Sequence, residues 1–226
     1  ATPDSLKDEA NKKKMNPKML ASFVDGSKTM IEMTALSNGI NLPLDKVGMN
    51  GPVSEVKDLN KTLIPEEDGG VLSSTGRVDF AFGPAPGVFS IVKSDSPTVI
   101  EEMEYLSMGE GPYYTLYRPY HLASVEAPRS VGMAVINNES GLQPKTWISE
   151  VIGHAKKDLE PGETIDGIGG FSSYGVAYPV ADSKGLAPLG LLEDGKVTKS
   201  IKQGDPISLD SIELPDNLIN ELRRKQ

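Results

Sequence analysis

The chain has 226 residues, of which 38% are hydrophobic and 24% charged, enough to bury a core in one large domain or two small ones. A formal charge of -9 argues against a general affinity for nucleic acid or anionic membrane, because both are polyanions. The absence of cysteine excludes disulfides, a thiolate nucleophile and sulfur-bound zinc. With no apolar run near the roughly 20 residues of a membrane span, we expect a soluble, cytoplasmic protein.

The amino terminus, ATPDSLKDEANKKK, begins without methionine and is polar and charged. Such a composition is typical of a linker inside a longer polypeptide. We therefore expect further sequence upstream of residue 1.

A long amphipathic helix is predicted over residues 16–39, with Asn16 as N-cap, Pro17 in the first turn and Gly39 at the end. At about 100° per residue one face is apolar and the opposite face is polar, the polar face holding Lys18, Ser22, Asp25, Lys28, Thr29 and Glu32. This face is either solvated, with a Lys28 to Glu32 ion pair, or faces a ligand. A glycine inside a helix costs roughly 1 kcal/mol, so Gly26 favours a reason in packing or ligand approach.

The first half of the chain is predicted to be α+β. Residues 39–74 form an irregular connection with a short helix near 53–59. A hairpin of residues 77–82 and 88–93 follows, then a helix starting at Pro97 and helical spacing after residue 122.

The segment LYRPYHL, residues 116–122, places Tyr117, Arg118, Tyr120 and His121 around one proline. These groups suit the binding of a planar anion beside a proton donor. On chemistry alone, a functional and a structural interpretation of this segment are about equally supported.

From Trp147 onward, short strands and frequent glycines predict a small all-β domain. Residues 155–165 and 197–207 form an internal repeat with an offset of 42 residues. His154, Lys156 and Lys157 either bind an acidic sugar or phosphate, or belong to a surface strand with solubilising lysines. The stretch DGIGGFSSYG lacks dinucleotide-binding spacing, and no P-loop, HExxH, GxSxG or clustered metal-ligand pattern occurs.

Four segments carry a family resemblance: SFVDGSKTMIEMTALSNG, LYRPYHL, AKKDLEPGETIDGIGG and APLGLLEDGKVTKSIKQGD. Together they resemble the carboxy-terminal half of homoserine-dehydrogenase-like NAD(P)-dependent oxidoreductases that end in a SAF (β-clip) domain, a group that includes 1-deoxy-D-xylulose 5-phosphate reductoisomerase-like enzymes. The resemblance implies a catalytic and oligomerisation domain over residues 1–146 and a SAF domain over residues 147–226. It also implies a homo-oligomer, a Rossmann domain absent from this chain that holds most of the NADP or NAD, and room for a divalent metal.

The resemblance assigns roles to the polar residues. Lys28 donates a proton or hydrogen bond to the substrate carbonyl as hydride arrives, Glu32 and Asp25 orient it or abstract a proton, and His121 is a second acid or base. Arg118 grips the substrate anion, with Tyr117, Tyr120 and Thr29 beside it. Homoserine dehydrogenase has an aspartate and a lysine four residues apart, whereas here Lys28 and Glu32 exchange the charges.

The exchanged charges indicate a substrate other than homoserine: a small phosphorylated or carboxylated hydroxy-carbonyl or sugar-derived molecule. The alternative is a SAF-type module that binds a sugar acid or another subunit without catalysis.

Overall fold

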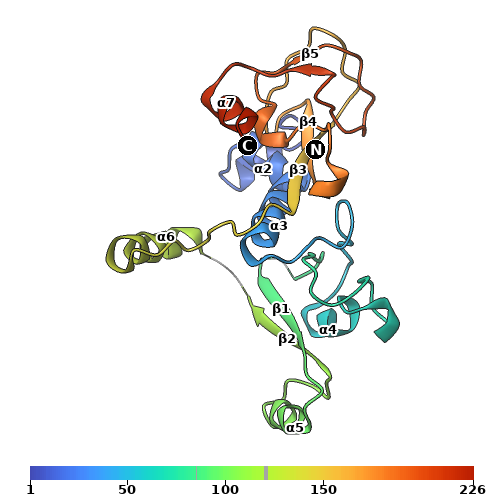
Figure 1. Ribbon diagram of the computed structural model, residues 1–226, viewed down its shortest axis with the longest axis vertical. Coiled ribbons are helices and arrows are strands. Elements are labelled where there is room, and N and C mark those ends of the chain that lie inside the picture. Colours follow the sequence, from blue (N-terminus) through green and yellow to red (C-terminus); the bar gives the residue numbers. More distant parts are fainter. Residues whose placement is uncertain (85, 120–121) are drawn as a thin grey trace. The chain divides into compact units, whose positions relative to one another are not determined.

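We describe residues 1–84, 86–119 and 122–226 of a computed structural model (Figure 1). They form an α+β fold with three two-stranded antiparallel sheets among the described residues, as predicted at this level. The chain divides into two compact units, Ala1–Gly48 with Lys145–Gln226, and Met49–Pro144. These units reflect packing; the division into a catalytic domain of residues 1–146 and a SAF domain of residues 147–226 stays a prediction.

The first unit begins with α1 (Lys7–Lys12), α2 (Pro17–Val24) and α3 (Ser27–Ile40). The Asn16 side chain accepts hydrogen bonds from the backbone of Lys18 and Met19, which confirms it as the N-cap. The single helix predicted over residues 16–39 is wrong, because the chain breaks at Gly26, whose φ is +84°. Glycine adopts this left-handed conformation without steric cost and so ends one helix and starts the next.

The break also changes which side chains are buried. Leu20 and Met30 are buried as expected, but Met19, Phe23 and Val24 are about half exposed. Helix α2 has only eight residues and is separate from α3. It therefore buries a narrower face than one continuous helix over residues 16–39 would bury.

Helix α3 packs against the sheet of β3 (Ser149–Ala155) and β4 (Ser173–Pro179). These strands pair antiparallel, with Ile152 opposite Val176. Short elements complete the unit: the 3-10 turns η4 (Val180–Asp182) and η5 (Leu189–Leu191), the strands β5 (Lys196–Val197) and β6 (Ile212–Glu213), and the helix α7 (Leu218–Arg224).

The two copies of the internal repeat pair with each other. Leu159 and Ile201, equivalent residues in the two copies, exchange two backbone hydrogen bonds of 2.9 Å. The bond from Gly162 N to Val197 O is matched by that from Gly204 N to Ala155 O, which is the same pair after a shift of 42 residues. The repeat therefore forms a local two-fold arrangement with Leu159 and Ile201 at its centre.

The second unit is built on β1 (Val88–Lys93) and β2 (Tyr113–Arg118), which pair antiparallel with Phe89 opposite Tyr117. The predicted hairpin of 77–82 with 88–93 is wrong, since residues 88–93 pair with 113–118 and Phe82 bridges to Val53. Helix α5 (Pro97–Tyr105) joins the strands and starts at Pro97, as predicted.

A small core of Leu59, Leu63 and Leu72 packs beneath this sheet. Leu59 lies in α4 (Leu59–Thr62) and Leu63 directly follows it, in a connection that also contains the 3-10 turns η1 (Val56–Asp58) and η2 (Glu66–Asp68). Beyond β2 lie α6 (Ala123–Gly132) and the π-helical turn η3 (Met133–Asn137). Across the described ranges, no helix has the length and apolarity to cross a membrane.

Candidate functional site

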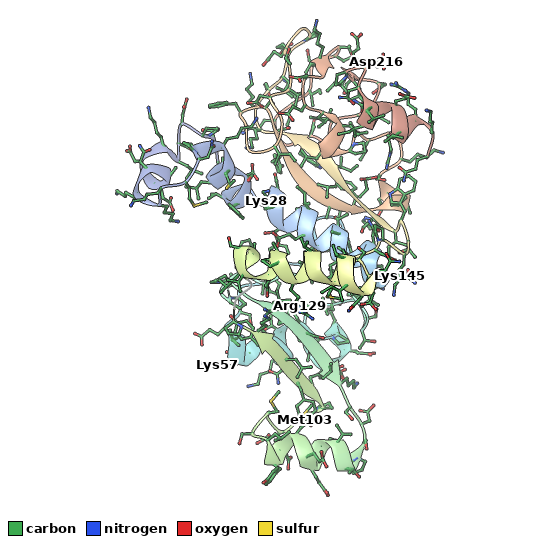
Figure 2. All side chains as sticks on the ribbon, turned by 90° about the vertical axis from the view of Figure 1, so that its left-hand side faces the viewer. Lys28, Lys57, Met103, Arg129, Lys145 and Asp216 are labelled. Atoms are coloured by element: carbon green, nitrogen blue, oxygen red, sulfur yellow. The ribbon has the colours of Figure 1, made fainter. Side chains whose placement is uncertain are left out.

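The start of α3 is held in place by contacts of Asp25, just before the helix, and of Ser27, its first residue. The Asp25 carboxylate accepts a hydrogen bond from Ser27 N at 2.9 Å, and the Ser27 hydroxyl accepts one from Gly175 N of β4 at 2.9 Å. The second Asp25 oxygen lies 2.7 Å from the ammonium of Lys156, directly after β3. The hydrogen bond from Gly175 thereby fixes the helix to the β3–β4 sheet at its first residue, and Figure 2 shows α3, which carries the labelled Lys28, next to this sheet.

The ion pair of Asp25 and Lys156 is buried. The two side chains are 4% and 6% exposed, and Lys156 also donates to Gly170 O at 2.7 Å. The Lys156 ammonium is not aligned for a hydrogen bond to Asp25 Oδ2, so the attraction between them is mainly Coulombic. These are the contacts of a group that orients α3.

The first turn of α3 is open in the sense that several of its polar groups have no partner among the described residues. Within the described part of the chain, the amides of Lys28 and Thr29, the Lys28 ammonium and the Thr29 hydroxyl have no hydrogen-bond or ion-pair partner. The turn has no acidic residue, and both side chains are partly exposed. Free amides at a helix N-terminus beside a cation form an anion-binding arrangement.

Glu32 lies one turn after Lys28 on the same side of α3 and is exposed. The Lys28 to Glu32 ion pair considered from the sequence does not form among the described ion pairs. Both charges remain available to a third group.

In the second unit, Tyr117 and Arg118 are neighbours on β2 and so project to opposite faces. Tyr117 donates to Pro84 O at 3.0 Å and lines a cavity of about 760 Å³ together with Lys57, Lys61 and Tyr113. Arg118 instead forms an ion pair with Glu126 of α6. Tyr120 and His121, predicted as parts of the same site, lie outside the described residues.

A cluster that the sequence did not indicate ties η2 to this sheet. Tyr113 donates to Asp68 at 2.5 Å, and Lys93 lies 3.4 Å from the same carboxylate and 5.0 Å from the Tyr113 ring centroid. The hydrogen bond from Tyr113 is the main cause that lowers the pKa of Asp68, and burial raises the pKa of Tyr113. No local pattern marks residues so distant in sequence as partners.

His154 is a structural residue in this fold. One ring nitrogen, Nδ1, lies 2.8 Å from Gly204 O, an obligate acceptor, so Nδ1 carries the proton and Nε2 accepts from the Tyr178 hydroxyl at 2.9 Å. Burial lowers its pKa, which favours the neutral ring. Lys156 is buried and Lys157 pairs with Glu163, so the three basic residues do not form one anion-binding cluster.

The glycine-rich stretch at 167–170 surrounds its own carboxylate. Asp166 accepts hydrogen bonds from Phe171 N at 2.6 Å and Ser172 N at 3.0 Å. Burial raises the pKa of Asp166, but the hydrogen bonds from Ser172 and Phe171 outweigh it and lower the pKa overall. The loop is therefore filled and does not fit a dinucleotide pyrophosphate, and the described residues contain no group of three or more acidic or histidine side chains suited to a metal.

Residues 1–127 match the family model described as "Oxidoreductase DRL, catalytic domain". The matched region includes α2, α3, β1 and β2, so it contains both the open start of α3 and the Tyr117 cavity. It defines the protein as an oxidoreductase catalytic domain. Because the match covers more than half of the chain, the protein belongs to the oxidoreductase DRL catalytic-domain family. A search of curated proteins found no match.

Proposed function

We propose that this chain is the catalytic part of an NAD(P)-dependent oxidoreductase that acts on a small anionic hydroxy-carbonyl or sugar-derived substrate. The observation that carries the proposal is the open first turn of α3, inside the region that matches the oxidoreductase family. Its free amides and ammonium suit a phosphate, a carboxylate or a developing oxyanion.

In this proposal Lys28 contacts the oxygen of the substrate carbonyl and stabilises negative charge there. A lysine in the first turn of a helix is disfavoured by the helix dipole, and a bound anion relieves that cost. Glu32 accepts a hydroxyl proton, Thr29 hydrogen-bonds the substrate, and Asp25 positions the turn through Lys156. Anion binding by Arg118, Tyr117, Tyr120 and His121 stays a prediction from the sequence, because Tyr117 and Arg118 project to opposite faces of β2 and Arg118 pairs with Glu126.

The cofactor is proposed to be NADP or NAD, which supplies or accepts a hydride when bound. The filled loop at Asp166 does not fit a pyrophosphate, and we assign cofactor binding to a Rossmann domain outside these residues. The proposed reaction is compatible with a divalent metal, to which we assign no ligand.

The finer family placement, with a 1-deoxy-D-xylulose 5-phosphate reductoisomerase-like catalytic domain and a SAF domain, is supported by the two-fold pairing of the repeat. A homo-oligomer is supported by apolar side chains on α6 and η3, where Val125, Val131, Val135 and Ile136 are 62% to 82% exposed.

Steady-state reduction of dihydroxyacetone phosphate by the whole natural protein, with NADPH or NADH, tests the proposal. Replacing Lys28 with alanine is expected to lower kcat/KM about 100-fold, the typical loss of one oxyanion-stabilising group. The control is Lys12→Ala, an exposed lysine of α1 without a partner among the described ion pairs. Equal kcat/KM for the two variants would refute the role of Lys28, and binding of phosphorylated sugars without any turnover would favour a non-catalytic binding module.

A further inference from the structure

A second cavity lies in the first unit, outside the region that matches the oxidoreductase family. It has a volume of about 620 Å³, within the range of small-molecule sites. It is bounded by residues around η4 and η5 and by helix α7. Of these elements, Figure 1 labels α7.

The wall of this cavity is largely apolar. Leucines 186, 191, 209 and 214 contribute to it with the Trp147 indole. Trp147 and Leu209 are 46% and 44% exposed, so the apolar surface is open to solvent. An exposed apolar concavity of this kind is stabilised by an apolar ligand, because the ligand removes that surface from water.

Every charged residue that lines the cavity is a cation, although the chain carries a net charge of -9. Arg223 stacks over Trp147 at 4.4 Å and is held by Glu150 at 2.6 Å. Arg224 pairs at 3.0 Å with Asp216, whose side chain is 95% exposed. Lys184 has no ion-pair or hydrogen-bond partner in the described part of the chain.

Asn220 independently indicates a binding site, because it places an unsatisfied hydrogen-bond acceptor at the cavity. It lines the cavity, is only 2% exposed, and its Oδ1 has no hydrogen-bond partner among the described residues. Buried acceptors of this kind are ordinarily satisfied by protein, water or a bound molecule.

We propose that this cavity binds a small amphiphilic anion, a monocarboxylate with an apolar body. The apolar body lies against the leucines and Trp147, and the carboxylate is placed at Lys184, the lining cation without an acidic partner among the described residues. A sugar phosphate fits poorly, because the apolar wall leaves its hydroxyl groups without partners. The cavity is therefore a site separate from the start of α3.

Tryptophan fluorescence can detect a ligand in this cavity directly, because the single tryptophan of the chain, Trp147, lines it. Decanoate is the probe, titrated against the 226-residue chain with tryptophan fluorescence and calorimetric stoichiometry. Decylamine, with the same apolar chain and the opposite charge, is the matched probe. We expect saturable binding of one decanoate per chain, about tenfold tighter than decylamine, since Lys184 attracts the carboxylate and repels the ammonium, a difference of about 1.4 kcal/mol.

Two variants place the ligand. Lys184→Gln is expected to weaken decanoate binding about fivefold, whereas Lys12→Gln, the same charge change on α1, leaves it unchanged. Ala181→Phe, at an exposed lining position, is expected to block binding without unfolding the unit. Equal affinity for decanoate and decylamine, equal effects of the two lysine variants, or no saturable binding would each overturn the proposal.

Discussion

The buried ion pair of Asp25 and Lys156 makes a quantitative prediction about the stability of the first unit. Replacing Lys156 with methionine keeps the apolar stem and removes the charge. The Asp25 carboxylate, 4% exposed, then keeps only its hydrogen bond from Ser27 N. Breaking a buried pair in this way leaves an unpaired charge and is expected to cost about 3 kcal/mol of unfolding free energy.

Urea unfolding followed by Trp147 fluorescence measures this cost, because the only tryptophan belongs to the first unit. Lys199→Met is the matched control. Its ammonium also lies 2.7 Å from a carboxylate, that of Asp210, but the two side chains are 61% and 73% exposed. Solvent screening limits the expected loss there to about 1 kcal/mol or less.

The double variant Asp25→Asn with Lys156→Met removes both charges and retains an oxygen for Ser27 N. We expect it to be more stable than Lys156→Met alone by about 2 kcal/mol. Equal losses for Lys156→Met and Lys199→Met would contradict the claim that the α2–α3 junction depends on a buried ion pair.

Three further outcomes follow from the same structure. Because burial lowers the pKa of His154, the folded state binds fewer protons than the unfolded state, and the free energy of unfolding should fall as pH drops below about 6.5. In urea titrations between about pH 7.5 and pH 5.5, His154→Gln should flatten this decline. Replacing Gly162 or Gly204 with alanine should lower the free energy of unfolding by about 1 kcal/mol, because their φ angles of +94° and +88° strain a residue with a side chain even in open space. Gly190→Ala, at a position without positive φ, should leave thermal unfolding unchanged. Lys28→Ala should leave unfolding free energy within about 0.5 kcal/mol of the wild type, since Lys28 is partly exposed and unpartnered; a larger loss by urea titration would indicate a structural role for this lysine.

Local signals in the sequence predicted local structure. Asn16 before Pro17 predicted a helix start, and the side-chain bonds of Asn16 confirm it. Pro97 predicted the start of α5. The repeat offset predicted two similar segments, and in the structure the two copies pair through the antiparallel bridge of Leu159 and Ile201.

Contacts between distant residues could not be predicted from the same signals. Gly26 fits the middle of a helical pattern, and its break is fixed by Ser27 binding to Gly175, 148 residues away. The strand at 88–93 had a near neighbour at 77–82, yet it pairs with 113–118 across α5. Pairing of this kind depends on side-chain packing over the whole unit, which periodicity does not encode.

For the candidate site, the sequence indicated Lys28, Thr29 and Glu32 but placed them on the flank of a continuous helix. The structure places Lys28 and Thr29 in a first turn with free amides. The sequence also grouped Tyr117 with Arg118, although neighbours on one strand face opposite sides.

The central claim, that the start of α3 binds the substrate anion, is tested most directly by amide NMR of the 226-residue chain titrated with dihydroxyacetone phosphate. We expect saturable shifts of the Lys28 and Thr29 amide resonances, and none with dihydroxyacetone, which lacks the phosphate. Saturable binding that leaves both amides unmoved would contradict the claim.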